Sequence, residues 1–161
     1  MKQKIRSILD YLVQRPGAVR IKSYTEQDDG SFEVETPLSE SNNETNLRYE
    51  AIGDNTMFRI EIRHTFGYID VRIPPQEAAG QLLRMLARNT GSFYNTTAFF
   101  GVQQDKAGKI LATLNSFHHF LTNWSDADIA EALYLHFFDL VMGMTTKDTS
   151  LTMLKMFGDD G

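Results

Sequence analysis

The chain contains 161 residues, carries a formal net charge of −5 and has no cysteine. Its length suits one domain whose core needs no covalent staple. The missing cysteines exclude disulfides, thiolate nucleophiles and cysteine-ligated metal sites, and the acidic balance argues against a general nucleic-acid binder. No apolar run reaches the roughly 18 residues of a membrane span, and no signal-type core follows the basic N-terminus. We therefore expect a cytoplasmic protein without a membrane span.

Residues 2–14 are predicted to form the first helix. Its apolar side chains recur at helical spacing and fall on one face, namely Ile5, Ile8, Leu9, Leu12 and Val13. Pro16 ends the helix, because a proline disfavours the helical region for the residue before it. No aromatic side chain anchors the apolar face among residues 2–10. We therefore expect this face to pack against the core and not against a membrane surface.

Five segments of alternating apolar and polar residues follow, a pattern that predicts an antiparallel sheet with one covered face. They span residues 19–24, 31–36, 47–52, 57–64 and 67–73. The turn between the first two segments is Asp28-Asp29-Gly30, in which glycine adopts a positive φ without strain. The polar residues 37–46 predict a loop that is long for a compact domain.

A central helix is predicted inside the stretch 73–89, where the alternating pattern gives way to helical spacing. Pro75 suits the first helical position, because no backbone N–H is needed there. The buried stripe is formed by Ala79, Leu82, Leu83 and Leu86. Gly80 costs about 1 kcal/mol of helix stability relative to alanine, and it permits close approach of another backbone.

A second hairpin is predicted from residues 97–102 and 109–117, and a last long helix begins at Ser125. Asp128 stands three residues after Ser125, as in a variant of the capping box. The expected fold class is α+β, with an antiparallel β-sheet and N-terminal, central and C-terminal helices in the order α-β meander-α-ββ-α. Residues 1–144 would form this single domain, and residues 145–161 a short amphipathic C-terminal tail.

No catalytic or metal-binding motif stands out in the sequence. His118 and His119 are adjacent in a predicted strand and point to opposite faces, so they do not converge on one metal ion. His136 lies on the apolar stripe of the last helix, which favours a buried core histidine over a general base. Phosphate-binding loops and nucleophile elbows are also missing. We therefore expect no enzyme activity, no cofactor and no metal.

The order of these elements resembles the type III secretion chaperone-like superfamily, which includes the secretion chaperones and the YbjN-type sensory-transduction-regulator domains. The local likeness is carried by Phe99-Phe100-Gly101-Val102, by Ile110-Leu111-Ala112-Thr113-Leu114 and by the apolar helix from Ser125. The resemblance implies a non-enzymatic homodimer, a chaperone or adaptor that binds an extended or amphipathic segment of a client protein. In such families the middle helix lies near the dimer interface. By analogy, the contact residues here would be Gln81, Arg84, Met85 and Arg88.

A second hypothesis belongs to a different functional class. A curved antiparallel sheet wrapped by helices can enclose a small apolar ligand, as a carrier does. The aromatic residues that would line such a cavity are Phe58, Phe66, Phe99, Phe100 and Tyr134. A third alternative is a structural subunit without a binding function of its own. A buried cavity with converging polar groups would favour the carrier over the protein-binding domain.

Overall fold

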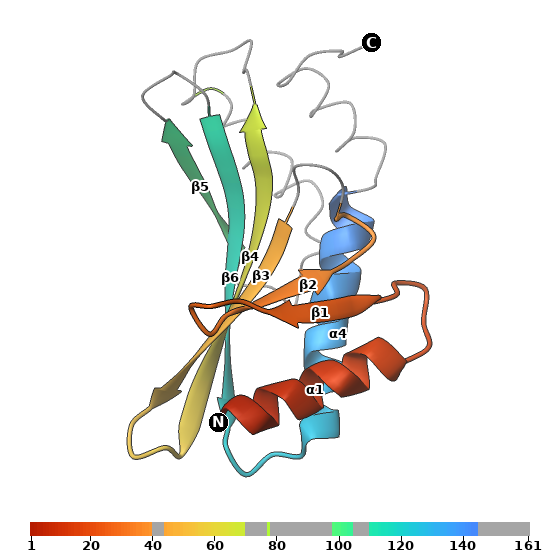
Figure 1. Cartoon of the computed structure of the whole chain (residues 1–161), viewed down its shortest axis with the longest axis vertical. Helices are drawn as coiled ribbons and strands as arrows, with labels where there is room; N and C mark the ends of the chain where they lie inside the picture. The colour runs from red at the N-terminus through yellow and green to blue at the C-terminus, as the bar shows by residue number, and fades with distance from the viewer. Residues whose placement is uncertain (40–43, 70–76, 78–97, 105–109, 145–161) are drawn as a thin grey trace.

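The computed structural model shows an α+β arrangement in which a curved antiparallel sheet packs against two helices (Figure 1). The structure describes residues 1–39, 44–69, 77, 98–104 and 110–144. Within these residues the elements are α1 (Lys2–Gln14), β1 (Ser23–Glu26), β2 (Phe32–Glu35), β3 (Glu44–Ile52), β4 (Met57–Ile69), β5 (Ala98–Gln104), β6 (Ile110–Leu121) and α4 (Asp126–Met144). No helix in the described part of the chain is long and apolar enough to cross a membrane.

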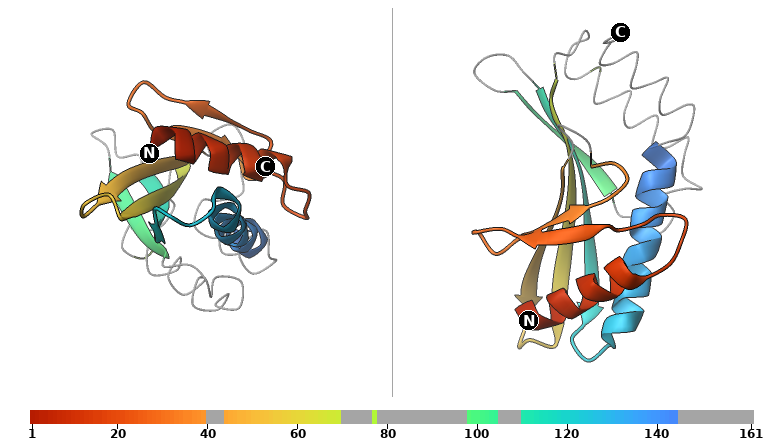
Figure 2. Two further views of the ribbon diagram at one scale, coloured as in Figure 1. Left: turned by 90° about the horizontal axis from the view of Figure 1, so that it is seen from below. Right: turned by 45° about the vertical axis from the view of Figure 1, so that its right-hand side comes forward.

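The sheet has six strands in the order β1-β2-β3-β4-β6-β5, and every neighbouring pair is antiparallel. The long strands β4 and β6 lie at its centre and pair along most of their length. Strands β2 and β3 share only two register pairs, Phe32 with Leu47 and Glu33 with Asn46. The β1–β2 hairpin therefore turns away and runs across the direction of the long strands (Figures 1 and 2).

The sequence-based expectation of two separate strands at 57–64 and 67–73 is wrong. Residues 57–69 form one strand, β4, which pairs with β6 on both sides of an irregularity between Thr65 and Tyr68. A register shift of this kind absorbs extra residues without reversing the chain. Gly67, the first residue of the second predicted strand, lies within this irregular region.

The first predicted strand, 19–24, is shifted in the structure to Ser23–Glu26. Val19 and Ile21 are both buried, so the alternation of apolar and polar residues here reflects burial of the loop and not pairing of a strand. The preceding loop is hydrogen-bonded to the sheet at its end, where the Lys22 N–H donates to the Glu35 carbonyl at 2.9 Å. At the other boundary, β3 begins at Glu44, two residues before the predicted loop ends.

One face of the sheet forms the core with α1 and α4. The apolar stripe of α1 is buried as predicted, at Ile5, Ile8, Leu9 and Leu12. It packs in one cluster with sheet residues and α4 residues, among them Phe32, Leu47, Phe58, Ile60, Leu133 and Phe137. The views in Figures 1 and 2 place both helices on the same side of the long strands. Burial of these side chains is the main stabilising term, at about 25 cal/mol per Å².

The start of α4 confirms the predicted cap. The Ser125 hydroxyl oxygen accepts the Asp128 N–H at 3.1 Å and donates to the Asp128 carboxylate at 2.6 Å. The reciprocal contact satisfies one of the N–H groups that the first turn of a helix leaves without a partner. The predicted central helix and the tail lie outside the described residues, apart from Glu77, which is helical and exposed.

A clamp around Tyr134 joins the end of α1 to α4. The Arg15 guanidinium makes two hydrogen bonds to the Glu131 carboxylate, each 2.8 Å long. It also stacks over the Tyr134 ring, 3.5 Å from the centroid. The backbone at Gly17 passes directly over the Tyr134 hydroxyl, which accepts the Val19 N–H at 3.4 Å. This close approach leaves no room for a side chain at position 17.

We predict that Gly17→Ala lowers the free energy of unfolding by about 1–3 kcal/mol, the usual cost of overpacking. The new Cβ would overlap the Tyr134 hydroxyl and would lie 2.8 Å from Tyr134 Cζ and 2.9 Å from Arg15 Nη1. Urea unfolding followed by circular dichroism measures the change. In Gly17→Ala/Tyr134→Phe the loss should be smaller than the sum of the two single losses, because the clashing hydroxyl is gone. A Gly17→Ala protein as stable as the wild type would contradict the close approach.

Candidate partner-binding surface

The face of the sheet opposite the core is polar and open. Its side chains alternate with the buried ones along β3 and β4, and they comprise Glu44, Asn46, Arg48 and Glu50 on β3 and Arg59, Glu61, Arg63 and Thr65 on β4. The register places Arg48 beside Glu61, and Glu50 beside Arg59. The Arg48 and Glu50 side chains are 56% and 63% exposed, so neither α1 nor α4 covers this face.

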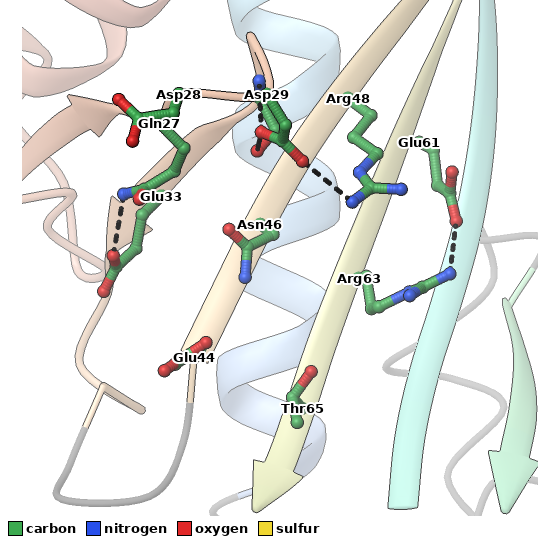
Figure 3. Close-up of a pocket in the computed structure, with 11 residues that line it drawn as sticks. Gln27, Asp28, Asp29, Glu33, Glu44, Asn46, Arg48, Glu61, Arg63 and Thr65 are labelled. Carbon is green, nitrogen blue, oxygen red and sulfur yellow. Dashed lines mark hydrogen bonds and ion pairs between the residues drawn. The ribbon is translucent and has the colours of Figure 1, made fainter. Parts of the chain in front are cut away.

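A hollow of about 470 Å³ lies on this face where the β1–β2 hairpin diverges from β3 (Figure 3). We call it the sheet hollow. Its lining consists of Gln27, Asp28, Asp29, Ser31, Glu33, Glu44, Asn46, Arg48, Glu61, Arg63 and Thr65. The hairpin provides one wall and β3 and β4 provide the floor, so residues from three parts of the chain meet here.

The wall is built on Asp29 in the β1–β2 turn. Gly30 follows with a φ of +81°, which glycine adopts without strain. The Ser31 N–H and hydroxyl both donate to Asp29 Oδ1, at 3.0 and 2.5 Å. Arg48 donates to the other carboxylate oxygen at 3.0 Å. The Ser31 hydrogen bonds, together with the charge of Arg48, lower the pKa of the Asp29 carboxyl, so this group is ionised at neutral pH.

The floor is held by Arg63. Its Nε donates to Asn115 Oδ1 at 2.9 Å, and its Nη2 lies 3.3 Å from the Glu61 carboxylate. Asn115 is only 4% exposed and in turn donates to the Thr113 hydroxyl at 3.0 Å. The chain of contacts extends from β4 to β6 and restrains the guanidinium of Arg63, because Asn115 is itself buried and hydrogen-bonded.

The charges of the lining do not balance. Five carboxylates (Asp28, Asp29, Glu33, Glu44 and Glu61) face two guanidiniums (Arg48 and Arg63), which leaves a net charge of −3. The two arginines are already paired, with Asp29 and Glu61. Among the residues that the structure describes, no cation pairs with Asp28, Glu33 or Glu44, although Gln27 donates to Glu33 at 3.1 Å.

A second polar group is buried between β6 and α4. Ser116 Oγ lies 3.2 Å from His136 Nε2 and 3.2 Å from His118 Nε2, and the two imidazole centroids are 4.6 Å apart. The serine has one hydroxyl proton, so at least one of the two Nε2 atoms carries a proton. Ser116 and His136 are 1% and 3% exposed. A substrate therefore has no access to this serine–histidine pair.

Burial controls the protonation of the internal histidines. It lowers the pKa of His136 to about 3, with His118 adding to the effect, and it lowers the pKa of His118 to about 4. His64, which lies 2.9 Å from the Thr45 hydroxyl, has a pKa of about 4 for the same reason. All three side chains are therefore neutral in the folded protein at neutral pH.

The structure confirms what the sequence predicted of the individual histidines. His118 is partly buried and His119 is exposed, as expected for adjacent strand residues, and His136 lies in the core. The contact between His118 and His136 was not predicted. The two residues stand 18 positions apart on different elements, and no local pattern reports which of them face each other across β6 and α4. Among the described residues, no group of three or more histidine, aspartate or glutamate side chains could hold a metal ion.

The structure places only part of the two sets of predicted contact residues. Gln81, Arg84, Met85 and Arg88 lie outside the described residues. Phe58 and Tyr134 are 0% and 5% exposed and belong to the packed core, where Phe58 packs at a tilt against Phe120 and Tyr134 against Phe138. Phe99 and Phe100 stand opposite Asn115 and Leu114 in the register, and Phe66 lies in the irregular part of β4. The side chains of these last three lie outside the described part.

The sheet hollow itself was missed in the sequence. Asp28-Asp29 was assigned to a turn and Glu44 to a loop, and each assignment suggested an ordinary solvated carboxylate. The signal that points to the site is the concentration of acidic and amide residues in the β1–β2 turn and at the start of β3. This pattern predicts a site only once the hairpin is known to fold back toward β3 and β4.

Comparison with known proteins gave no match for this chain, whether to a protein-family model, to a curated protein or to a solved structure.

We predict that the protein loses stability as the pH falls below 6.5. His64, His118 and His136 have folded-state pKa values of about 4, 4 and 3, all below the ordinary value of 6.5. Below pH 6.5 the unfolded chain therefore binds protons that the folded chain does not bind. The resulting loss of stability is absent well above pH 6.5 and grows until the pH approaches 4. Each histidine contributes a slope of at most about 1.4 kcal/mol per pH unit.

Urea unfolding at about pH 7 and about pH 5 measures this slope. His136→Gln should reduce the slope by about one third, because it removes one of three buried titrating groups. The control is His119→Gln, which removes an exposed imidazole whose charge is only a secondary cause of the lowered pKa of His118, so it should change the slope much less. Equal slopes in the wild type and in His136→Gln would show that the internal histidines do not resist protonation.

Proposed function

We propose that the protein is a non-enzymatic binding domain, a chaperone or adaptor that holds a segment of a partner protein. The observation that carries the proposal is the open polar face of the sheet with its sheet hollow. A face without binding function needs only scattered solvated side chains. Here residues from the hairpin, β3 and β4 converge, and several are fixed by hydrogen bonds before any partner arrives. Groups fixed in advance lose less entropy on binding.

The chemistry of the hollow suits a polypeptide segment better than a small apolar molecule. Small-molecule sites are mostly apolar, with a few converging polar groups. Every residue that lines the sheet hollow is polar or charged. The apolar side chains of this region, including Phe58 and Tyr134, are instead packed in the core. These features support protein binding over the alternative of an apolar ligand carrier.

The buried serine–histidine group supports the non-enzymatic character of the proposal. Ser116 and His136 resemble the first two members of a hydrolytic triad in their residue types. A nucleophile must reach its substrate and its base must accept a proton. Ser116 is almost completely buried, and the lowered pKa of His136 makes it a weak base. The pair therefore fits a structural role in satisfying polar groups inside the core.

The proposal includes a homodimer. Resemblance to the chaperone-like superfamily suggests the middle helix as the contact, with Gln81, Arg84, Met85 and Arg88 on the side that faces the second copy. A stable interface of this kind would bury about 1,600 Å². The face would have to exclude water around a central apolar side chain, a position that Met85 would occupy.

We predict that light scattering gives the mass of a dimer at micromolar concentration, and that Met85→Glu shifts the protein toward the 18.3 kDa monomer. A buried charge without a partner costs several kcal/mol, which is enough to dissociate a moderate dimer. Asp54→Lys serves as a control because it changes an exposed turn residue. A wild-type protein that stays strictly monomeric would rule out the dimer.

Partner binding is tested by affinity capture from the native host followed by mass spectrometry. We expect one protein to be enriched reproducibly, and a defined segment of that protein to bind the pure domain in calorimetry. Because a chaperone or adaptor contacts a segment and not a whole fold, the isolated segment should retain most of the affinity. Failure of every enriched protein to bind in purified form would contradict the proposal.

A further inference from the structure

We propose, resting on the protein-binding function above, that the sheet hollow receives an extended basic segment of the partner, with a lysine or arginine side chain seated between the β1–β2 turn and β3. The proposed function leaves open the charge and the backbone conformation of the partner segment. Both follow from the charges, the geometry and the fixed groups of the hollow.

The charge of the hollow selects a cation. Its lining carries a net charge of −3, and its two guanidiniums are held by Asp29 and Glu61 at 3.0 and 3.3 Å. The arginines therefore do not repel an incoming cation as isolated charges would. The carboxylates without a described cationic partner (Asp28, Glu33 and Glu44) remain to receive it. Charge complementarity of this kind steers association and excludes acidic competitors.

The position of these carboxylates defines where the cation sits. In Figure 3, Asp28 and Glu33 come from the hairpin side, while Glu44 lies at the lower end of β3. Asn46 stands between them, opposite Glu33 in the register, and offers an amide to the incoming segment. The paired arginines occupy the other side of the hollow. A lysine or arginine that enters from solvent therefore meets carboxylates on two sides and a neutral amide between them.

The strand geometry explains why the segment should be extended. Outward side chains on β3 stand at every second residue, at Glu44, Asn46 and Arg48. They repeat at about 6.8 Å, twice the rise of a strand residue, and an extended peptide presents its own side chains at the same interval. An extended segment laid along β3 can thus place one basic side chain near Glu44 and the next side chain of the same face near Asn46. A helix has no such repeat.

The test uses the full chain and a fluorescein-labelled synthetic peptide of alternating lysine and threonine, followed by fluorescence anisotropy. We expect the wild type to bind this peptide and not a matched peptide of alternating glutamate and threonine. Binding should weaken when the salt concentration rises from about 50 to about 300 mM, because salt screens exposed charges. Amide NMR shifts should concentrate at the β1–β2 turn and around Glu44, Asn46 and Thr65.

Glu44→Lys should weaken peptide binding by about threefold to tenfold, because it turns an attractive contact into a repulsive one. The matched control is Asp54→Lys, which makes the same change of charge at the exposed β3–β4 turn outside the hollow. Both positions are exposed, so both variants should keep the wild-type urea midpoint. Asp28→Lys should act like Glu44→Lys, since it reverses a carboxylate on the hairpin wall of the same hollow.

Three outcomes would overturn the inference: no binding of the basic peptide, equal binding of the acidic one, or equal affinity in Glu44→Lys and Asp54→Lys. Its failure can be told apart from failure of the proposed function. A captured partner segment that binds the wild type and Glu44→Lys equally well would leave the protein-binding function standing and place its site elsewhere. If no partner segment binds, both the protein-binding function and the basic-segment inference are wrong.

Discussion

The burial of one sheet face under α1 and α4 is the constraint on which the rest of the structure depends. In the part of the chain that the structure describes, the buried apolar side chains of β2, β3, β4 and β6 pack with those of the two helices in one continuous cluster. The Arg15 clamp on Glu131 and Tyr134 joins the helices to each other where α1 ends. Since side chains alternate along a strand, the residues between the buried ones point to the opposite face, which is exposed to solvent along β3 and β4.

The open face then becomes more than a solvated surface because the sheet twists. With only two register pairs to β3, the β1–β2 hairpin leaves the plane of the long strands and raises a wall beside them. Twist is a general property of β-sheets, so a wall of this kind costs no special strain. What is particular to this chain is the excess of carboxylates on and beneath the wall, which gives a polar hollow a preference for cations.

The core carries its own polar groups, and they are satisfied in pairs across elements. Thr45 on β3 meets His64 on β4, and Ser116 on β6 meets His118 and His136. Burial of an imidazole is tolerable only while it stays neutral and hydrogen-bonded. The same contacts that specify the packing of β6 against α4 therefore make the fold sensitive to acid.

The amino-acid sequence by itself determined α1, the cap of α4 and the alternation of buried and exposed residues along 57–64, because these features depend on spacing within a few residues. It also correctly placed His136 in the core. It could not show that residues 57–69 form one strand, since the shift in register between Thr65 and Tyr68 interrupts the alternating pattern in the same way as a turn would. Nor could it assemble the sheet hollow or join His118 to His136. The hollow brings Asp28 and Glu44 to one site, and the histidine contact joins β6 to α4. Only the twist of the sheet and the packing of the helices decide which distant side chains meet.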